Sequence, residues 1–145
     1  MREIFVRRGK RVDNGKWVYG NIVFTRSGRA FLLEGSFFSG ESHEGDFKHG
    51  EIYGTEVIPE TVGQFTGLKD KNGVRVFEGD ILSAHFDESY PDDETLLLVG
   101  NNGYAFTLKE EDSDPEMIDN SDMRFFDEIF VVIGNVHDNP EIKIL

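Results

Sequence analysis

PETVGQFTGLKDKNGVRVFEGDIL, from Pro59 to Leu82, carries the clearest structural signal in this 145-residue chain. Segments with aromatic and β-branched residues flank Asn72-Gly73. This pair accepts the positive φ angles of a tight hairpin turn. Glu78-Gly79-Asp80 then predicts a second bend, because glycine tolerates positive φ and an aspartate accepts hydrogen bonds from nearby backbone N–H groups. The stretch therefore predicts antiparallel strands joined by tight turns.

Short strands separated by turn signals continue along the rest of the chain, as in small β-barrels and sandwiches. Asn14-Gly15 predicts a hairpin turn, and Asn101-Asn102-Gly103 predicts another. Helix is expected to be scarce: residues 115–126 are expected to hold at most a turn or two. The predicted strands are residues 3–8, 16–24, 30–33, 56–59, 61–66, 74–77, 81–86, 95–99, 103–109 and 128–136.

Two uninterrupted apolar runs, residues 96–99 and 129–133, are typical of strands covered on both faces. Thirteen Phe and 38% hydrophobic residues are enough for a real core. The core is predicted to include Val18, Phe24, Phe31, Leu33, Phe65, Leu68, Phe77, Ile81, Leu98, Phe106, Val131 and Ile133.

The length suits one domain, or one domain with a smaller companion. We expect an N-terminal β-hairpin region over residues 1–58, with a glycine-rich arm at 34–55, and a second β region over residues 59–145. The chain has no cysteine, which excludes disulfides and thiolate chemistry and favours a reducing compartment. It shows neither a signal-peptide core nor an apolar run long enough to span a bilayer, so a soluble cytoplasmic protein is expected.

The net charge of −13 is unevenly distributed. Residues 1–30 hold eight Lys/Arg against two acids, a net +6, whereas the remaining 115 residues hold seven bases and 26 acids, a net −19. An acidic body repels phosphate backbones, so nucleic-acid binding by the whole protein is disfavoured. The basic end is expected to pair with the acidic body, within one chain or across a homo-oligomer.

Metal binding is not favoured by any spacing in the chain. The acidic stretch after residue 110 lacks the spacing of a calcium loop and is interpreted as a solvated loop. His43 and His49, beside Glu44 and Asp46, match no standard metal motif and are interpreted as surface residues. The acids weighed as calcium ligands are Asp112, Asp114, Asp119 and Asp122.

Catalytic motifs are missing as well. There is no Gly-x-Ser-x-Gly elbow, no phosphate-binding loop and no dinucleotide fingerprint. With 28 acids in the chain, some carboxylates will lie close together by chance, so a carboxylate pair is weak evidence for hydrolysis. We assign no catalytic residue and no cofactor, and an enzyme is not expected.

One aromatic and basic cluster remains open to two interpretations. Trp17 and Tyr19 lie near Lys16, Arg7 and Arg8 in the sequence, and such interleaving can stack single-stranded nucleic acid. Packing of Trp17 on its neighbouring strand is the favoured interpretation.

The residues that mark the turns are interpreted as architectural, since they bend the backbone or accept its N–H groups. This structural signature comprises Gly63, Gly67, Asp70, Asn72, Gly73, Glu78, Gly79, Asp80, Gly134, Asn135, Asn139 and Pro140. With the strand at Trp17-Val18-Tyr19-Gly20, these segments resemble the YopX family of phage and prophage proteins. Residues 4–8, IFVRR, stand where that family usually has a strand with a Trp, so no role of that Trp is carried over.

The resemblance implies a protein encoded by a phage or prophage that acts in a bacterial cytoplasm. It also implies a largely β fold with a small SH3-like barrel after Phe65, and self-association. It supplies no catalytic residue. We therefore expect a non-enzymatic accessory protein that acts through protein–protein contacts, as a homo-oligomer or with a host or phage protein. The alternative is an acidic mimic of DNA that occupies a host nucleic-acid-binding protein, since 14 of the 28 acids lie between residues 87 and 128.

Overall fold

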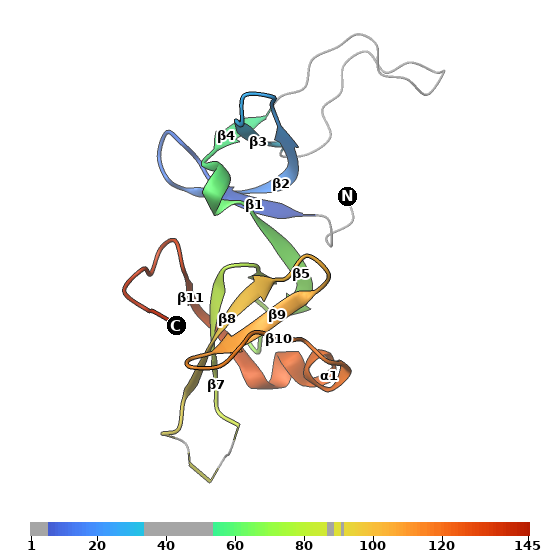
Figure 1. Cartoon of the computed structure of the whole chain (residues 1–145), viewed down its shortest axis with the longest axis vertical. Helices are drawn as coiled ribbons and strands as arrows, with labels where there is room; N and C mark the ends of the chain where they lie inside the picture. The colour runs from blue at the N-terminus through green and yellow to red at the C-terminus, as the bar shows by residue number, and fades with distance from the viewer. Residues whose placement is uncertain (1–5, 34–53, 87–88, 91) are drawn as a thin grey trace, which may run out of the picture. The chain divides into compact units, whose positions relative to one another are not determined.

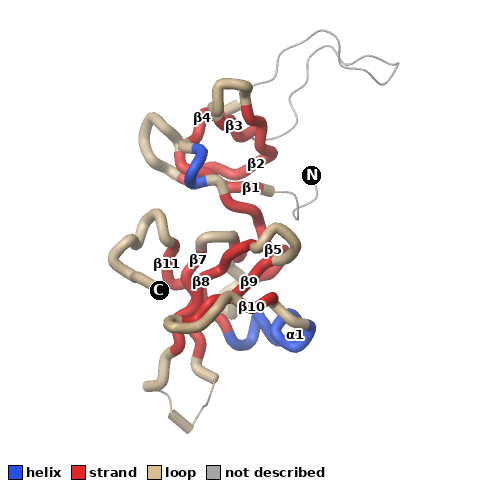
Figure 2. The backbone as a smooth tube through the Cα atoms, viewed as in Figure 1, coloured by secondary structure: helices blue, strands red, loops and turns tan. Residues whose placement is uncertain are grey.

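The structure is a computed structural model of the chain and describes residues 6–33, 54–86, 89–90 and 92–145. It divides into two compact units, Met1–Gln64 (the N-terminal unit) and Phe65–Leu145 (the C-terminal unit). Strands dominate both units, and the described residues contain one α-helix (Figures 1 and 2). The prediction of a mainly β protein is confirmed. The predicted boundary after residue 58 stays a prediction, and most of the predicted glycine-rich arm lies outside the described residues.

The N-terminal unit is an antiparallel meander. Its elements are β1 (Arg7–Lys10), β2 (Trp17–Phe24), β3 (Ala30–Leu33), β4 (Thr55–Val57), the 3-10 turn η2 (Pro59–Thr61) and the start of β5 (Gly63–Lys69). Each of β1 to β4 pairs with the next, and β1 also pairs with the first residues of β5. An isolated bridge between Arg11 and Val57 links the end of β1 back to β4. One bridge is not a ladder, so this curved sheet is not a closed barrel.

Alternation along the strands places the core of this unit on one face of the sheet. Val18, Ala30, Leu32 and Val57 are buried together, and Ile22 packs against them. The pairing Gly9↔Val18 puts Gly9 on the same face, where a Cβ would lie 3.0 Å from the Val57 side chain. Glycine therefore lets β1 and β4 approach closely across the core.

In the C-terminal unit, β5 continues and pairs with β6 (Arg75–Phe77). A five-stranded antiparallel sheet follows, in the order β10-β9-β8-β7-β11. The remaining elements are β7 (Asp80–Ala84), β8 (Thr95–Asn101), β9 (Phe106–Glu110), β10 (Glu116–Met117), α1 (Asn120–Ile129) and β11 (Phe130–Asn135). Its core contains Val76, Leu82, Ala84, Leu97, Val99, Leu108, Phe126 and Phe130.

The SH3-like barrel implied for the region after Phe65 is not confirmed, because neither sheet is closed into a barrel. β10 and β11 are the two edges of the C-terminal sheet and do not pair with each other. Helix is scarce, as predicted, but α1 is longer than expected and takes in residues 128–129, which were assigned to the last strand. β10 was not predicted, because two residues carry no recognisable alternation.

Two predicted core residues are exposed. Phe24 is 59% exposed at the end of β2, and Ile133 is 43% exposed where the pairing of β11 with β7 shifts between Val132 and Gly134. The sequence pattern gave no sign of that shift. No helix among the described residues is long and apolar enough to cross a membrane.

Candidate functional site

Asp70 joins the turn of the β5–β6 hairpin to β11. Its Oδ1 accepts hydrogen bonds from the backbone N–H groups of Asn72 and Val74, each at 2.8 Å. Its Oδ2 accepts the N–H of Val132, 62 residues away, at 2.9 Å. The side chain is 2% exposed, and the N–H of Lys71 adds a bond to the carbonyl of Phe130 at 2.9 Å. Both carboxylate oxygens of Asp70 are thus used by backbone groups.

The Glu78-Gly79-Asp80 bend lies beside the middle of the sheet. Asp80 is 1% exposed, and its Oδ2 accepts the N–H of Phe77 at 2.7 Å. Gly79, at φ +93°, donates to the carbonyl of Val99 at 2.8 Å and accepts the N–H of Val136 at 3.0 Å. A non-glycine residue would be strained at that φ. Glu78, the first residue of this bend, is half-buried.

The turn after β11 is held by two asparagines. The side-chain oxygen of Asn135 accepts the N–H groups of His137 and Asp138 at 3.0 and 2.9 Å. The side-chain oxygen of Asn139 accepts the N–H of Asn135 at 3.1 Å. A Cβ on Gly134 would overlap the Asn139 side chain, so the turn requires glycine there. These contacts hold a tight turn with side-chain oxygens.

The remaining signature residues lie in strands and turns. Gly63 is opposite Arg8 in the β1–β5 pairing. Gly67 has φ +84° and lies where the pairing of β5 with β6 shifts. Gly73, at φ +78°, completes the hairpin turn, and Pro140 is exposed. The structure brings Asp70 to β11, whereas the other signature residues lie in separate strands and turns.

A groove of about 370 Å³ lies in the C-terminal unit, and we name it the acidic groove. Its apolar lining includes Leu97, Leu108, Phe130 and Phe86. The rings of Phe86 and Phe130 meet edge to face with centroids 6.0 Å apart. Phe86 is 56% exposed and Met117, which also lines the groove, is 61% exposed, whereas Leu97, Leu108 and Phe130 are buried beneath them. The apolar surface that a partner can reach is therefore that of Phe86 and Met117.

Carboxylates rim this apolar lining. Leu97 pairs with Glu110 across β8 and β9, and Leu108 pairs with Glu116 across β9 and β10. Directly paired residues point to the same face of a sheet, so Glu110 and Glu116 stand on the face that carries the leucines. The loops before and after β10 add two further rim acids, Asp114 and Asp119.

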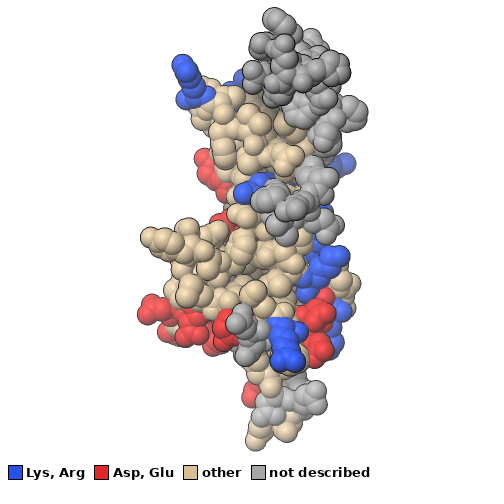
Figure 3. Space-filling model, turned by 90° about the vertical axis from the view of Figure 1, so that its right-hand side faces the viewer, with Lys and Arg blue, Asp and Glu red and all other residues tan. Residues whose placement is uncertain are grey.

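The groove lies in the acidic part of the molecule. Residues 65–145 contain six Lys/Arg and 19 Asp/Glu, a net −13 that equals the charge of the whole chain. Figure 3 shows acidic side chains in the part of the view that this unit occupies, with Lys and Arg beside some of them. An acidic rim around an apolar lining suits a cationic group on an aliphatic stem.

Sequence reasoning interpreted these acids as solvated loops and missed the groove. The sequence did contain part of this information. Leu108 and Glu110 are two residues apart, so their side chains must lie on the same face of a strand that contains both. Within the described part of the chain, no cluster of three or more His, Asp or Glu residues is arranged to hold a metal ion. His43 and His49 lie outside that part, as do the contacts of the Asp122 side chain.

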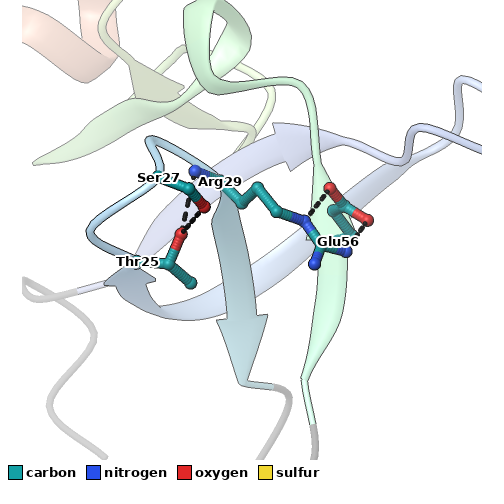
Figure 4. A network of polar contacts seen from close by, with 4 residues as sticks. All are labelled: Thr25, Ser27, Arg29 and Glu56. Carbon is teal, nitrogen blue, oxygen red and sulfur yellow. Dashed lines mark hydrogen bonds and ion pairs between the residues drawn. The ribbon is translucent and has the colours of Figure 1, made fainter.

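In the N-terminal unit, a polar network fixes the β2–β3 turn to β4 (Figure 4). The guanidinium of Arg29 donates two hydrogen bonds to the carboxylate of Glu56, at 2.9 and 2.8 Å. Thr25 accepts the N–H of Arg29 at 3.1 Å, and its hydroxyl lies 2.9 Å from that of Ser27. Arg29 also lies over the ring of Phe31, 5.1 Å from its centroid.

The Arg29–Glu56 pair predicts a pH effect. Hydrogen bonds from Arg29 hold the pKa of Glu56 below its ordinary value. The pair therefore stabilises the unit above the ordinary glutamate pKa, about 4.3, and the contribution is lost as the pH falls through the lowered pKa. We expect an NMR titration of the Glu56 carboxyl carbon to show a lowered midpoint, and Arg29→Gln to raise it towards the ordinary glutamate pKa. A midpoint that Arg29→Gln leaves unchanged would contradict this prediction.

Comparison with known proteins gave two positive findings. The family model described as YopX protein matches residues 9–142. Three chains of solved structures match. One is the crystal structure of protein EF1440 from Enterococcus faecalis, which is 28% identical, has a TM-score of 0.56 and aligns over 93% of this chain and 94% of that chain. The comparison with curated proteins found no match.

Proposed function

This chain belongs to the YopX family, and we propose that it is a non-enzymatic accessory protein of a phage or prophage that acts through protein–protein contacts in the bacterial cytoplasm. The observation that carries the proposal is the acidic groove, with its apolar lining and four rim carboxylates. We propose that the groove binds a basic segment of a partner protein.

The chemistry of the groove favours lysine or arginine side chains. Their aliphatic stems can lie on Phe86 and Met117, the exposed apolar side chains of the lining, while the charged heads reach the rim acids. Each surface charge pair contributes modestly, about 0.2–1 kcal/mol, so several must act together with the apolar contact. Nucleic acid does not suit the groove, because its phosphates would meet carboxylates.

The contacts of the β5–β6 hairpin support a scaffold role for the structural signature. Its member Asp70 accepts three backbone N–H groups. Thr66, a hairpin residue outside the signature, donates to the carbonyl of Val76 at 2.7 Å and accepts the N–H of Leu68 at 3.1 Å. Polar atoms that hold the backbone in this way are not available to orient a substrate. We propose that these positions shape the turns and carry no catalysis.

A second copy of the chain is one source of a basic segment. Residues 1–30 hold eight Lys/Arg against two acids, whereas the C-terminal unit is strongly acidic. We propose that the basic residues 1–30 of one copy and the C-terminal unit of a neighbouring copy attract each other. Light scattering after size exclusion should then show a homo-oligomer that dissociates at high salt, because such attraction is screened.

A defined peptide tests the groove. A synthetic peptide of alternating Lys and Leu should shift NMR signals of the residues around Leu97, Leu108 and Phe86, and the same peptide with Gln in place of Lys should not. The double variant Glu110→Gln/Glu116→Gln should weaken binding about five- to tenfold, since two rim pairs of surface strength are lost. Phe86→Ala should weaken binding as well.

The matched control removes the same charge elsewhere. Glu111→Gln/Asp93→Asn neutralises two exposed acids that do not line the acidic groove. Binding within about twofold of the unaltered protein is expected for this pair, because only long-range charge changes. Equal weakening by both double variants would show that the peptide follows net charge alone, and would overturn the groove as a binding site.

The second candidate is a mimic of DNA, favoured by the concentration of the net charge of −13 in the C-terminal unit. A mimic should be captured by a purified basic DNA-binding protein in a steeply salt-dependent way. Charge reversal of Asp92, Asp93, Asp112 and Asp114 should then abolish capture, whereas a groove binder should tolerate reversal of the first three, which do not line the groove.

We also propose an SH3-like arrangement, and residues 7–64 support it better than the region after Phe65. β1 to β4 form a meander, and the Arg11–Val57 bridge turns β4 back towards β1. The single-turn η2 then leads into β5, which pairs with β1. A barrel of this kind needs short, strongly curved strands joined in this order.

A further inference from the structure

The outer face of the N-terminal sheet carries aromatic side chains from two neighbouring strands. Burial alternates along β2: Val18 is 7% exposed on the core side, whereas Tyr19 and Val23 are 39% and 42% exposed on the other. Trp17 shares the outer side by the same alternation. Phe31 joins it because Phe31 pairs with Val23 across β2 and β3. We name Trp17, Tyr19, Val23 and Phe31 the aromatic face.

Basic side chains accompany these rings. Lys10 and Arg8 of β1 are opposite Trp17 and Tyr19. The guanidinium of Arg8 lies 4.6 Å from the centroid of the Trp17 ring, and the ammonium of Lys10 lies 5.7 Å from it. Trp17 therefore packs against its neighbouring strand, as the favoured interpretation of the sequence predicted. Arg8 is itself only 7% exposed, so the positive charge at the surface of the aromatic face comes mainly from exposed Lys16 and Arg26.

Positive charge is concentrated in the segment that carries most of this face. Residues 1–30 hold eight Lys/Arg against two acids, although the N-terminal unit as a whole has nine of each. Exposed Lys16 and Arg26 lie just before β2 and just after it. Positive side chains around exposed rings are the two elements that bind single strands without sequence preference.

We propose that the aromatic face binds single-stranded nucleic acid. Trp17 and Tyr19 are two residues apart on one strand, about 6.8 Å, which gives each ring room for one base. Exposed Lys16 and Arg26 bind the phosphates, and Arg29 is engaged by Glu56. A duplex is not the ligand, because its bases are stacked and hidden from these rings.

Fluorescence tests this binding directly, because Trp17 is the only tryptophan in the chain. An oligothymidine of about 12 nucleotides, a length within the range bound by single-strand modules, should quench Trp17 emission at low salt. Inorganic polyphosphate, which has the charge but no bases, should not. Anisotropy of a labelled oligothymidine supplies a second readout that does not depend on the tryptophan.

Two variants and a matched control accompany the titration. Tyr19→Ala should weaken binding about fivefold or more, the lower end of what one stacked base contributes. Lys16→Glu should weaken binding and reduce the slope of log affinity against log salt by about one or more. Tyr104→Ala removes a tyrosine that is 95% exposed in the C-terminal unit and should change nothing.

Several results would overturn the proposal. One such result is that neither tryptophan quenching nor anisotropy detects binding of oligothymidine at low salt. Another is equal affinity for polyphosphate, or for poly-glutamate, which would assign the basic side chains to anions in general or to an acidic protein. The proposal is independent of the acidic groove, because Glu110→Gln/Glu116→Gln should leave oligothymidine binding intact or raise it slightly.

Discussion

Asp70→Ala is expected to destabilise the C-terminal unit by about 3–5 kcal/mol, because it leaves three backbone N–H groups without their acceptor in a buried place. Each such loss is costly when water cannot replace the carboxylate. The loss is large against a total stability of about 5–15 kcal/mol. Urea unfolding should show it as a lower midpoint, and hydrogen exchange at the Asn72, Val74 and Val132 amides should become faster.

Two further variants test this prediction: Asp70→Asn is a conservative change at the same residue, and Asp93→Ala is a control at an exposed aspartate. The asparagine keeps an oxygen for the N–H groups of Asn72 and Val74 but turns an amide N–H towards that of Val132, so an intermediate loss of about 1.5–3 kcal/mol is expected. Asp93 is exposed, and its removal should change stability by less than about 0.5 kcal/mol. A gain in stability for Asp70→Ala would instead identify Asp70 as a binding group held at a cost to the fold.

The turns could be predicted because their chemistry is local. Gly15, Gly73, Gly79 and Gly103 were placed in turns from the sequence, and all four have positive φ. Glycine is the residue that occupies this region without strain, so its position reports the backbone directly. The positions of most strands along the chain followed from the segments between these turns, but their order within the two sheets was not predicted.

The core could be predicted only in part, because an apolar run does not show which residues face inward. In β8, Leu97 and Val99 are buried and Leu98 is half-buried, although Leu98 was the residue predicted for the core. In β11, Phe130 is buried and Ile133 is exposed at the shift in pairing. Alternating polar residues would have revealed these faces, and neither run contains any.

Contacts between distant segments could not be predicted at all. The Asp70–Val132 bond joins residues 62 apart, and the Arg29–Glu56 pair joins residues 27 apart. The rim of the acidic groove needs β10, whose two residues give no pattern. Composition located the acids, but only the fold brings Glu110 and Glu116 onto the face that carries Leu97 and Leu108.

Phe126→Ala and Phe125→Ala provide a matched pair on adjacent residues of α1. Phe126 is 1% exposed and lies in the core with Phe130, their ring centroids 4.5 Å apart, whereas Phe125 is 43% exposed. Truncation of a buried phenylalanine costs about 3–5 kcal/mol, from lost burial and from the cavity that remains. Truncation of the exposed neighbour should cost less than about 1 kcal/mol, mostly from lost partial burial.

Denaturant unfolding distinguishes global from local effects of this pair. If α1 is part of the cooperative core, Phe126→Ala should lower the urea midpoint with little change in the slope, and amides of β7 and β11 should exchange faster. If α1 instead unfolds on its own, helical circular dichroism should fall first while the strands keep their protection. That second outcome, or equal losses of stability for both variants, would show that the sheet does not depend on the Phe126–Phe130 contact. It would also show that α1 does not hold Phe130 in place in the acidic groove.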